Sequence, residues 1–171
     1  MHCLTVYFKR LAFVCGLTLA VVSGVLLGLR HAQPLQARFL NTTFTVTNTN
    51  NAGAGSLREA ILNANTIGGA DTINFNLSGC PCVIVLSSTL PLITNEVNIF
   101  GPGADQLTID GNNSVRVFDA DVVPVTISDL TVQNGFTTGA GAGIHSTSDL
   151  ILTKMWFFKA QRCNAQVIKR L

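Results

Sequence analysis

The chain has 171 residues and a formal net charge of +2, a length that suits one domain of ordinary size. The charge is unevenly distributed, because residues 38–153 hold three basic and nine acidic side chains, whereas residues 154–171 hold five basic and no acidic ones. The bulk of the chain is therefore acidic, which argues against a nucleic-acid-binding protein, and we expect no nucleic acid among its partners.

The first 37 residues predict an export signal. Two basic residues, Lys9 and Arg10, precede an uncharged apolar run over residues 11–29, and alanines suited to cleavage follow it. This order of charged, apolar and small residues is typical of a secretory signal peptide. The run is also long enough to cross a bilayer, so an uncleaved membrane anchor at 11–29 is the alternative. Both interpretations export the rest of the chain to the cell surface or the medium.

Residues 56–65 predict a short helix. Ser56 is a good N-cap, and Glu59 three residues later completes a capping box. The apolar residues at helical spacing form a single stripe: Leu57, Ala60, Ile61 and Ala64. A helix of this length is marginal alone, so we expect its stripe to pack on the rest of the protein.

The remainder of the chain predicts short β-strands separated by turns rich in Gly, Asn, Asp and Pro. The runs with β-branched, alternating character are residues 43–48, 71–75, 82–86, 97–101, 107–111, 115–119, 125–135, 142–146 and 150–153. No second helical pattern separates these runs, which excludes an alternating βαβ sheet. An antiparallel sandwich and a parallel solenoid remain.

Internal repetition favours the solenoid. The segment VTISDLTV from Val125 aligns with LILTK from Leu150, an offset of 25 residues, and GADTI at 69–73 returns as GADQLTI at 103–109. We therefore predict an all-β chain that forms a parallel β-helix, with the short helix covering the apolar end of the first coil. The alternative is a helix packed on the side of a sandwich.

Several segments, in order, resemble a known family. The stretch FTVTNTNNAGAGSLREAILNANTIGGADTINF resembles the N-terminal module tagged by Cys-Ser-Leu-Arg-Glu-Ala at the head of bacterial right-handed parallel β-helix proteins. The segments LPLITNEVNIFGPGADQLTIDGNN and VTISDLTVQNG resemble the coils of that family, so the resemblance covers residues 44–153. Gly55 stands where the tag has Cys. The resemblance implies a bacterial, secreted or surface-attached right-handed β-helix with an adhesin-like or structural role and little chemistry.

The resulting organisation is a signal at 1–37, a capping module at 38–80, coils at 81–153 and an aberrant tail at 154–171. The tail gathers three aromatic residues among its basic ones and abandons strand alternation. It is either a basic amphipathic ending or the product of a frameshift. We favour the frameshift, because shifting KMWFFKAQ by one base permits K-C-G-F-S-K, which continues the coil pattern after LILT. The chain would then be the truncated head of a longer β-helix, prone to edge-to-edge self-association.

Three carboxylates are weak catalytic candidates: Asp110, Asp119 and Asp121, with Arg116 nearby. Polysaccharide lyases and hydrolases of β-helix type need paired or metal-bound carboxylates on one outward face. Asp is also favoured in turns and corners, and we prefer that structural role for all three. His145 follows a glycine-rich corner, and no motif places a Ser or Asp beside it.

We expect no catalytic site, no metal and no cofactor. Cys80 and Cys82 in the segment CPC predict two buried or partly reduced thiols, because a bridge across one residue is strained. They are too few to hold a metal.

A structural or adhesive module is therefore the preferred function, and a carbohydrate-active enzyme is the alternative. The polar residues expected to form one outward row, able to contact glycans or cell-surface proteins, are Thr108, Thr126, Ser128, Thr131 and Gln133. Membrane contact is expected only through residues 11–29, if they are not cleaved.

Overall fold

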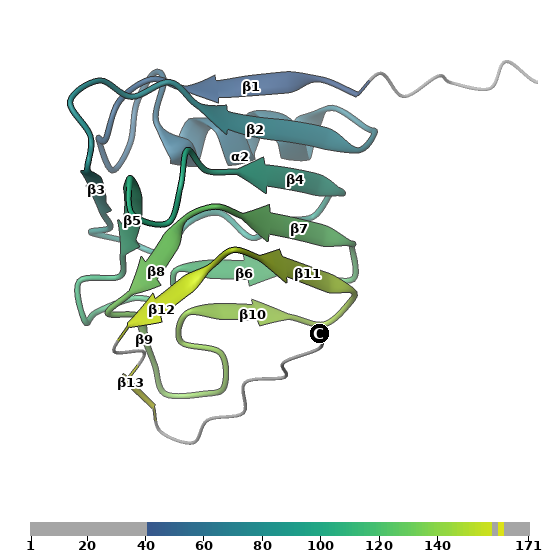
Figure 1. Cartoon of the computed structure of the whole chain (residues 1–171). Helices are drawn as coiled ribbons and strands as arrows, with labels where there is room; N and C mark the ends of the chain where they lie inside the picture. Colours follow the sequence, from purple (N-terminus) through teal and green to yellow (C-terminus); the bar gives the residue numbers. More distant parts are fainter. Residues whose placement is uncertain (1–40, 159–160, 163–171) are drawn as a thin grey trace, which may run out of the picture. The chain divides into compact units, whose positions relative to one another are not determined.

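The computed structural model describes residues 41–158 and 161–162, which form a parallel β-solenoid of about four turns with one short helix (Figure 1). Every strand pair within these residues is parallel. The predicted solenoid is thus confirmed, and the sandwich is excluded. The export signal and most of the tail lie outside the described residues.

The first sheet has one strand from each successive coil. Its strands are β1 (Thr43–Val46), β2 (Asp71–Phe75), β4 (Val97–Phe100), β7 (Val125–Ser128) and β11 (Leu150–Thr153), hydrogen-bonded in that order. Their register stacks Ile73 on Ile99 and Ile99 on Ile127, and all three are fully buried. Because side chains alternate along a strand, this register keeps one apolar column inside every coil.

The other faces are built in the same way. The second sheet contains β3 (Cys82–Val85), β5 (Leu107–Asp110), β8 (Thr131–Gln133) and β12 (Trp156–Phe158). The third contains β6 (Phe118–Ala120) and β10 (Ile144–Ser146), and the fourth contains β9 (Phe136–Thr137) and β13 (Gln161–Arg162). An isolated parallel β-bridge between Ile93 and Ala120 extends the third sheet by one coil.

The 25-residue repeat is confirmed, because Leu150 pairs with Val125 and Leu152 with Ile127. The other repeat is wrong as a coil-to-coil equivalence. The strand of GADTI is β2 in the first sheet, whereas that of GADQLTI is β5 in the second, so Ile73 stacks on Ile99. The same turn residues serve two different corners of the coil.

One predicted strand is divided by a corner. The run 125–135 becomes β7 and β8, because Asp129 has a φ of 57° and turns the chain from the first sheet to the second. Asp and Asn adopt this left-handed conformation more readily than most residues. This corner packs tightly on the corresponding corner of the preceding coil, since a Cβ on Gly101 would lie 2.1 Å from the Asp129 carbonyl oxygen.

The predicted helix is confirmed as α2 (Leu57–Thr66). Its N-cap, Ser56, accepts a hydrogen bond from the Glu59 amide, and the Glu59 carboxylate accepts one from the Gly55 amide at 2.6 Å. The buried residues are those of the predicted stripe: Leu57, Ala60, Ile61 and Ala64. They pack in the same core as the coils.

The helix completes the first coil rather than preceding it. Strand β1 comes before α2 and forms the edge of the first sheet, while α2 lies over the segment 88–95 of the next coil. Arg58 donates to the Thr89 carbonyl at 2.6 Å, and the Asn65 side chain donates to the Leu92 carbonyl at 2.7 Å. The helix thereby covers the apolar end of the stack beneath it.

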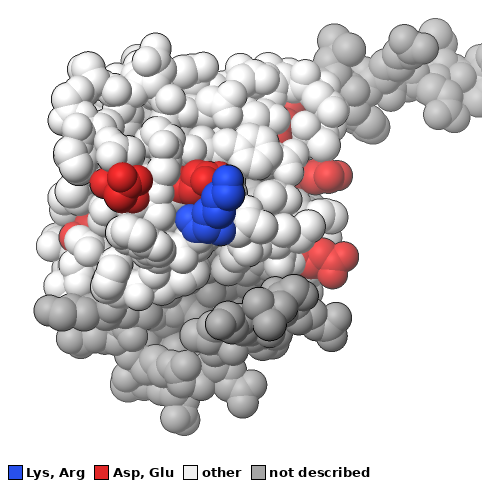
Figure 2. All heavy atoms as spheres, in the orientation of Figure 1, with Lys and Arg blue, Asp and Glu red and all other residues white. Residues whose placement is uncertain are grey.

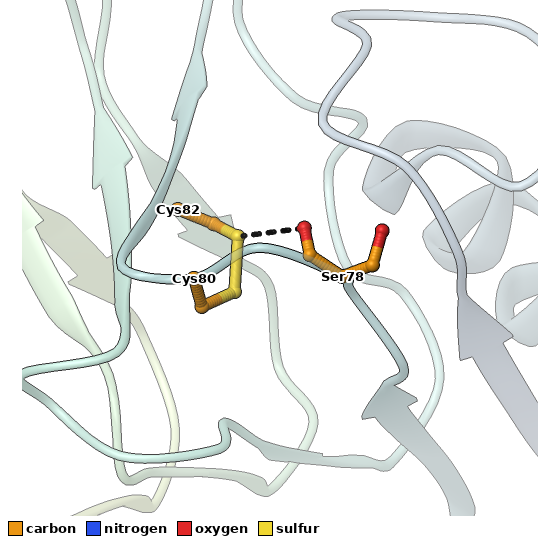
Figure 3. Close-up of a disulfide and its surroundings, with 3 residues drawn as sticks. All are labelled: Ser78, Cys80 and Cys82. Carbon is orange, nitrogen blue, oxygen red and sulfur yellow. Dashed lines mark hydrogen bonds between the residues drawn. A yellow bond between two sulfur atoms is a disulfide. The ribbon is translucent and has the colours of Figure 1, made fainter.

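Two expectations about the chain are corrected. Cys80 and Cys82 are not free thiols but form a disulfide, and both are half-exposed rather than buried (Figure 3). The turn between them brings their Cα atoms to 4.3 Å, so the sulfurs meet despite the single intervening residue. The tail does not abandon the strand pattern at once, because Trp156 pairs with Thr131 as β12 continues the second sheet.

Within the described part of the chain, no helix is long and apolar enough to cross a bilayer. The apolar run 11–29 lies outside that part.

Candidate functional site

A groove of about 490 Å³ lies beside the start of β6. Three segments line it: residues 89–92, residues 114–119 and residues 136–138. Two of the lining side chains are charged, Arg116 and Asp119, and several of the others are apolar or carry a hydroxyl group. Of the four residues that the sequence places in or near a catalytic site, these two therefore share a concave surface.

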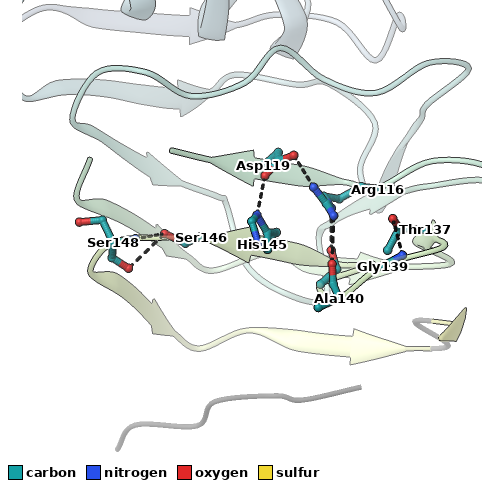
Figure 4. Close-up of polar contacts among 9 residues, drawn as sticks. Arg116, Asp119, Thr137, Gly139, Ala140, His145, Ser146 and Ser148 are labelled. Atoms are coloured by element: carbon teal, nitrogen blue, oxygen red, sulfur yellow. Dashed lines mark hydrogen bonds and ion pairs between the residues drawn. The ribbon is translucent and has the colours of Figure 1, made fainter. Parts of the chain in front are cut away.

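Asp119 faces outward because its neighbours on β6 face inward. Phe118 and Ala120 are almost fully buried, and the alternation of the strand turns the intervening carboxylate toward solvent. The register of the third sheet places His145 of β10 directly opposite Asp119. The His145 Nδ1 atom lies 2.8 Å from Asp119 Oδ1, so the two side chains are hydrogen-bonded from one coil to the next (Figure 4).

Arg116 ties the same carboxylate to a loop. Its Nη1 atom donates to Asp119 Oδ2, while Nε donates to the Gly141 carbonyl at 3.1 Å and Nη2 to the Ala140 carbonyl at 3.0 Å (Figure 4). All three nitrogens of the guanidinium group are thus used, and its planar fork suits this set of acceptors. The Arg116, Asp119 and His145 side chains form what we name the coil clamp, which joins two coils and holds loop 138–143.

The clamp constrains the chemistry available to Asp119. Oδ1 contacts His145 and Oδ2 contacts Arg116, so neither oxygen is without a hydrogen-bond partner. A general acid or nucleophile in glycoside hydrolysis must reach the substrate and work with a second carboxylate. Asp119 would have to exchange one of these partners for a substrate before acting in this way.

The structure does not bring the three candidate carboxylates together. Asp110 ends β5 in the second sheet and accepts hydrogen bonds from the Asn112 amide, Gln133 and Asn134, the last at 3.0 Å and 3.1 Å. Those contacts bind a turn to the next coil, as expected of a corner residue. Asp121 is exposed just after β6, where its backbone amide donates to the Ile93 carbonyl at 3.0 Å.

The five polar residues expected in one row are divided between two sheets. Thr126 and Ser128 belong to β7, whereas Thr108, Thr131 and Gln133 belong to β5 and β8. Ser128 and Thr131 are also buried, and they donate to the Asp129 carboxylate and the Ala104 carbonyl, both at 2.6 Å. The single outward row is therefore wrong, because a corner intervenes and two of its hydroxyls stabilise that corner.

The described residues contain no group of three or more His, Cys, Asp or Glu side chains that could hold a metal ion. On the face shown in Figure 2, charged side chains are scattered over a mostly uncharged surface. The coil clamp and its groove are consequently the best-defined polar site of this part of the protein.

The pairing of Asp119 with His145 was missed at the level of sequence. The sequence repeat was not a sufficient signal, because Leu150 follows Val125 by 25 residues whereas His145 follows Asp119 by 26. Extended backwards, the 25-residue offset would have placed Ile144 opposite Asp119, and a shift of one residue turns the side chain to the other face of the strand. The contacts of Arg116 with loop 138–143 carry no sequence signal, since they are made to backbone carbonyl groups.

Neither a scan of the chain against protein-family models nor a comparison with curated proteins finds a match.

Proposed function

We propose that this chain is an exported, right-handed parallel β-helix module of a bacterial secreted or surface protein, with a structural or adhesive role. The observation that carries the proposal is the regular stack of in-register coils, whose polar corner residues are largely engaged in joining one coil to the next. Such a stack offers extended, rigid faces for contact with glycans or other surface proteins. The signal-like segment and the resemblance of residues 44–153 to the tagged β-helix family support export and the right-handed form.

The experiment combines localisation with a test of binding and turnover. The chain is expressed with its own first 37 residues in a bacterial host, beside a variant whose apolar run carries Val21→Arg and Leu26→Arg. We expect the unmodified chain outside the cytoplasm and the variant inside, because charge in the apolar run blocks export. Retention of both chains in the cytoplasm contradicts the proposal.

The exported chain is then incubated with neutral and acidic polysaccharides. We expect retention on at least one glycan or on bacterial cells, without release of reducing ends or unsaturated sugars. Absence of binding to every glycan and cell type would contradict the adhesive role.

A carbohydrate-active enzyme is the second candidate, favoured by the groove that holds Arg116 and Asp119. Turnover of a polysaccharide that disappears in Asp119→Asn, and persists in Asp105→Asn, would establish this alternative. Asp105 is the matched control because it is an exposed carboxylate outside the groove.

A further inference from the structure

The Cys80–Cys82 disulfide lies at the corner that leads into β3 (Figure 3). Only one residue, the exposed Pro81, separates the two cysteines, and both of them are half-exposed. Neither the fold nor the proposed function assigns a task to this pair.

The bridge contributes little as a constraint on folding. A disulfide stabilises mainly by limiting the unfolded chain, and this effect grows with the length of the loop that it closes. A separation of two residues leaves almost no loop to constrain. The start of β3 is held independently, because the Cys82 amide donates to the Gln106 carbonyl at 2.8 Å and β3 pairs with β5.

The surroundings leave the pair open to a reagent in solution. Strand β3 is the last strand of the second sheet on its side, so no further described strand covers it. A Cβ added to the neighbouring Gly79 would meet no atom within 4 Å. Accessible disulfides are the ones that exchange readily with thiols, whereas structural ones resist reduction.

The two sulfurs differ in their environment. Cys82 packs against the hydrophobic core, and its Sγ lies 3.8 Å from the Ser78 carbonyl oxygen (Figure 3). That oxygen can accept a hydrogen bond from a Cys82 thiol once the bridge is open. Cys80 is not part of the core packing, so its sulfur is the one offered to an incoming group.

We propose that Cys80–Cys82 is a thiol–disulfide exchange site, attacked at Cys80 by an external thiol. The thiolate of that thiol forms a bond to Cys80 Sγ, the Cys80–Cys82 bond breaks, and its electron pair leaves on Cys82 Sγ. Cys82 then takes a proton from water and is held as a thiol at the Ser78 carbonyl. A second external thiolate releases Cys80, so two thiols become one disulfide while the protein gains two thiol groups.

The test follows each cysteine in the full chain by peptide mass spectrometry. Trypsin places Cys80 and Cys82 together in peptide 59–116, separate from Cys3, Cys15 and Cys163. The oxidised protein is incubated with reduced glutathione without denaturant, quenched with acid and alkylated. We expect the pair to be reduced under native conditions, with glutathione found on Cys80 before Cys82.

Two variants separate the roles of the sulfurs. Cys82→Ser should form a stable mixed disulfide with oxidised glutathione at Cys80, and Cys80→Ser should react at Cys82 at least about tenfold more slowly, because Cys82 is packed. Reduction of the unmodified chain should lower its melting temperature by less than about 4 °C, as expected of a bridge with little structural weight.

Three results would overturn the proposal. The first is alkylation of both cysteines in the untreated protein, which would mean that no bridge exists. The second is exchange that requires denaturant, or a loss of more than about 10 °C in melting temperature on reduction, which would make the bridge structural. The third is equal reactivity of the two single variants, which would remove the assigned direction of attack.

Discussion

Residues with a left-handed backbone conformation determine where this chain turns from one strand to the next. They lie at the turns that link successive strands, and Asn or Asp occupies several of them, as at Asn112, Asp129 and Asn134. Glycine occupies others, among them Gly53 and Gly55 in the approach to the helix. Gly55 has a second constraint, because its carbonyl accepts hydrogen bonds from the Thr47 and Asn48 amides at 2.9 Å and 3.3 Å.

Three glycine-to-alanine substitutions separate backbone strain from steric conflict. Gly55 combines a φ of +74° with a Cβ position only 2.2 Å from Thr47 Oγ1. Gly53 has a φ of +95° with nothing near its Cβ position, and Gly139 has neither feature. We expect Gly139→Ala to be nearly neutral, Gly53→Ala to lower the free energy of unfolding by about 1 kcal/mol, and Gly55→Ala to lower it by about 2–3 kcal/mol.

Urea denaturation of the three variants and the unmodified chain measures these differences. Equal losses for Gly55→Ala and Gly53→Ala would show that the contact with Thr47 is relieved without cost. A larger loss for Gly139→Ala would contradict the assignment altogether.

Arg116 is the residue on which the coil clamp depends. Its three donors reach one carboxylate and two backbone carbonyls, and its side chain is only 20% exposed. Removing it leaves these acceptors without their partner, so Arg116→Ala should lower the free energy of unfolding by about 1–3 kcal/mol. Lys154→Ala is the control, because Lys154 is 79% exposed and lies 3.7 Å from Asp129, and we expect about 0.5 kcal/mol or less.

Amide hydrogen exchange tests whether the coil clamp holds loop 138–143, which the free energy of unfolding does not report. Arg116→Ala should increase amide exchange in loop 138–143 more than in β4 or β7, because the loop loses its donor contacts. Uniform acceleration over all coils would mean that Arg116 acts on global stability rather than on the loop.

At the scale of the elements, the helix could be predicted almost completely, whereas the corner at Asp129 could not. Spacing and capping chemistry identified the buried face of α2, because both are local in sequence. The corner at Asp129, where φ is 57°, is hidden inside a run with continuous strand character. The repeated GADTI motif gave a wrong alignment of the coils. Its residues indicate that a turn precedes a strand, but they do not indicate which sheet of the coil that strand joins.

The role of α2 as a cover for the core is tested by two neighbouring residues of the same helix. Ile61 is 1% exposed, whereas Leu62 is 49% exposed. We expect Ile61→Ala to lower the free energy of unfolding by about 2–4 kcal/mol through the lost apolar contacts and the cavity left behind. Leu62→Ala should change it by no more than about 0.5 kcal/mol.

Thermal and chemical unfolding of Ile61→Ala and Leu62→Ala measure these changes in the free energy of unfolding. Similar losses for both, or a small loss for Ile61→Ala, would mean that α2 is not an integral wall of the core.

At the scale of the whole described stack, the two ends differ. At one end α2 buries its apolar stripe over the next coil. The last coil presents its apolar side chains instead, with Ile151 57%, Trp156 52% and Phe157 47% exposed. Strands at such an end offer backbone groups that can pair with another chain, and apolar side chains strengthen that tendency.

We therefore expect the chain to self-associate with rising concentration through the edge formed by β11 and β12. Ile151→Lys places a charge on this edge and should shift the size-exclusion profile toward monomer, in the way that natural edge strands avoid pairing. Val122→Lys adds the same charge at a corner residue that is 75% exposed and lies outside every strand, and it should leave the profile unchanged. The apolar run 11–29 is common to all three chains, so only the edge distinguishes them. Equal shifts for both variants would assign the effect to net charge, and a monomeric unmodified chain at every concentration would contradict the edge as a contact surface.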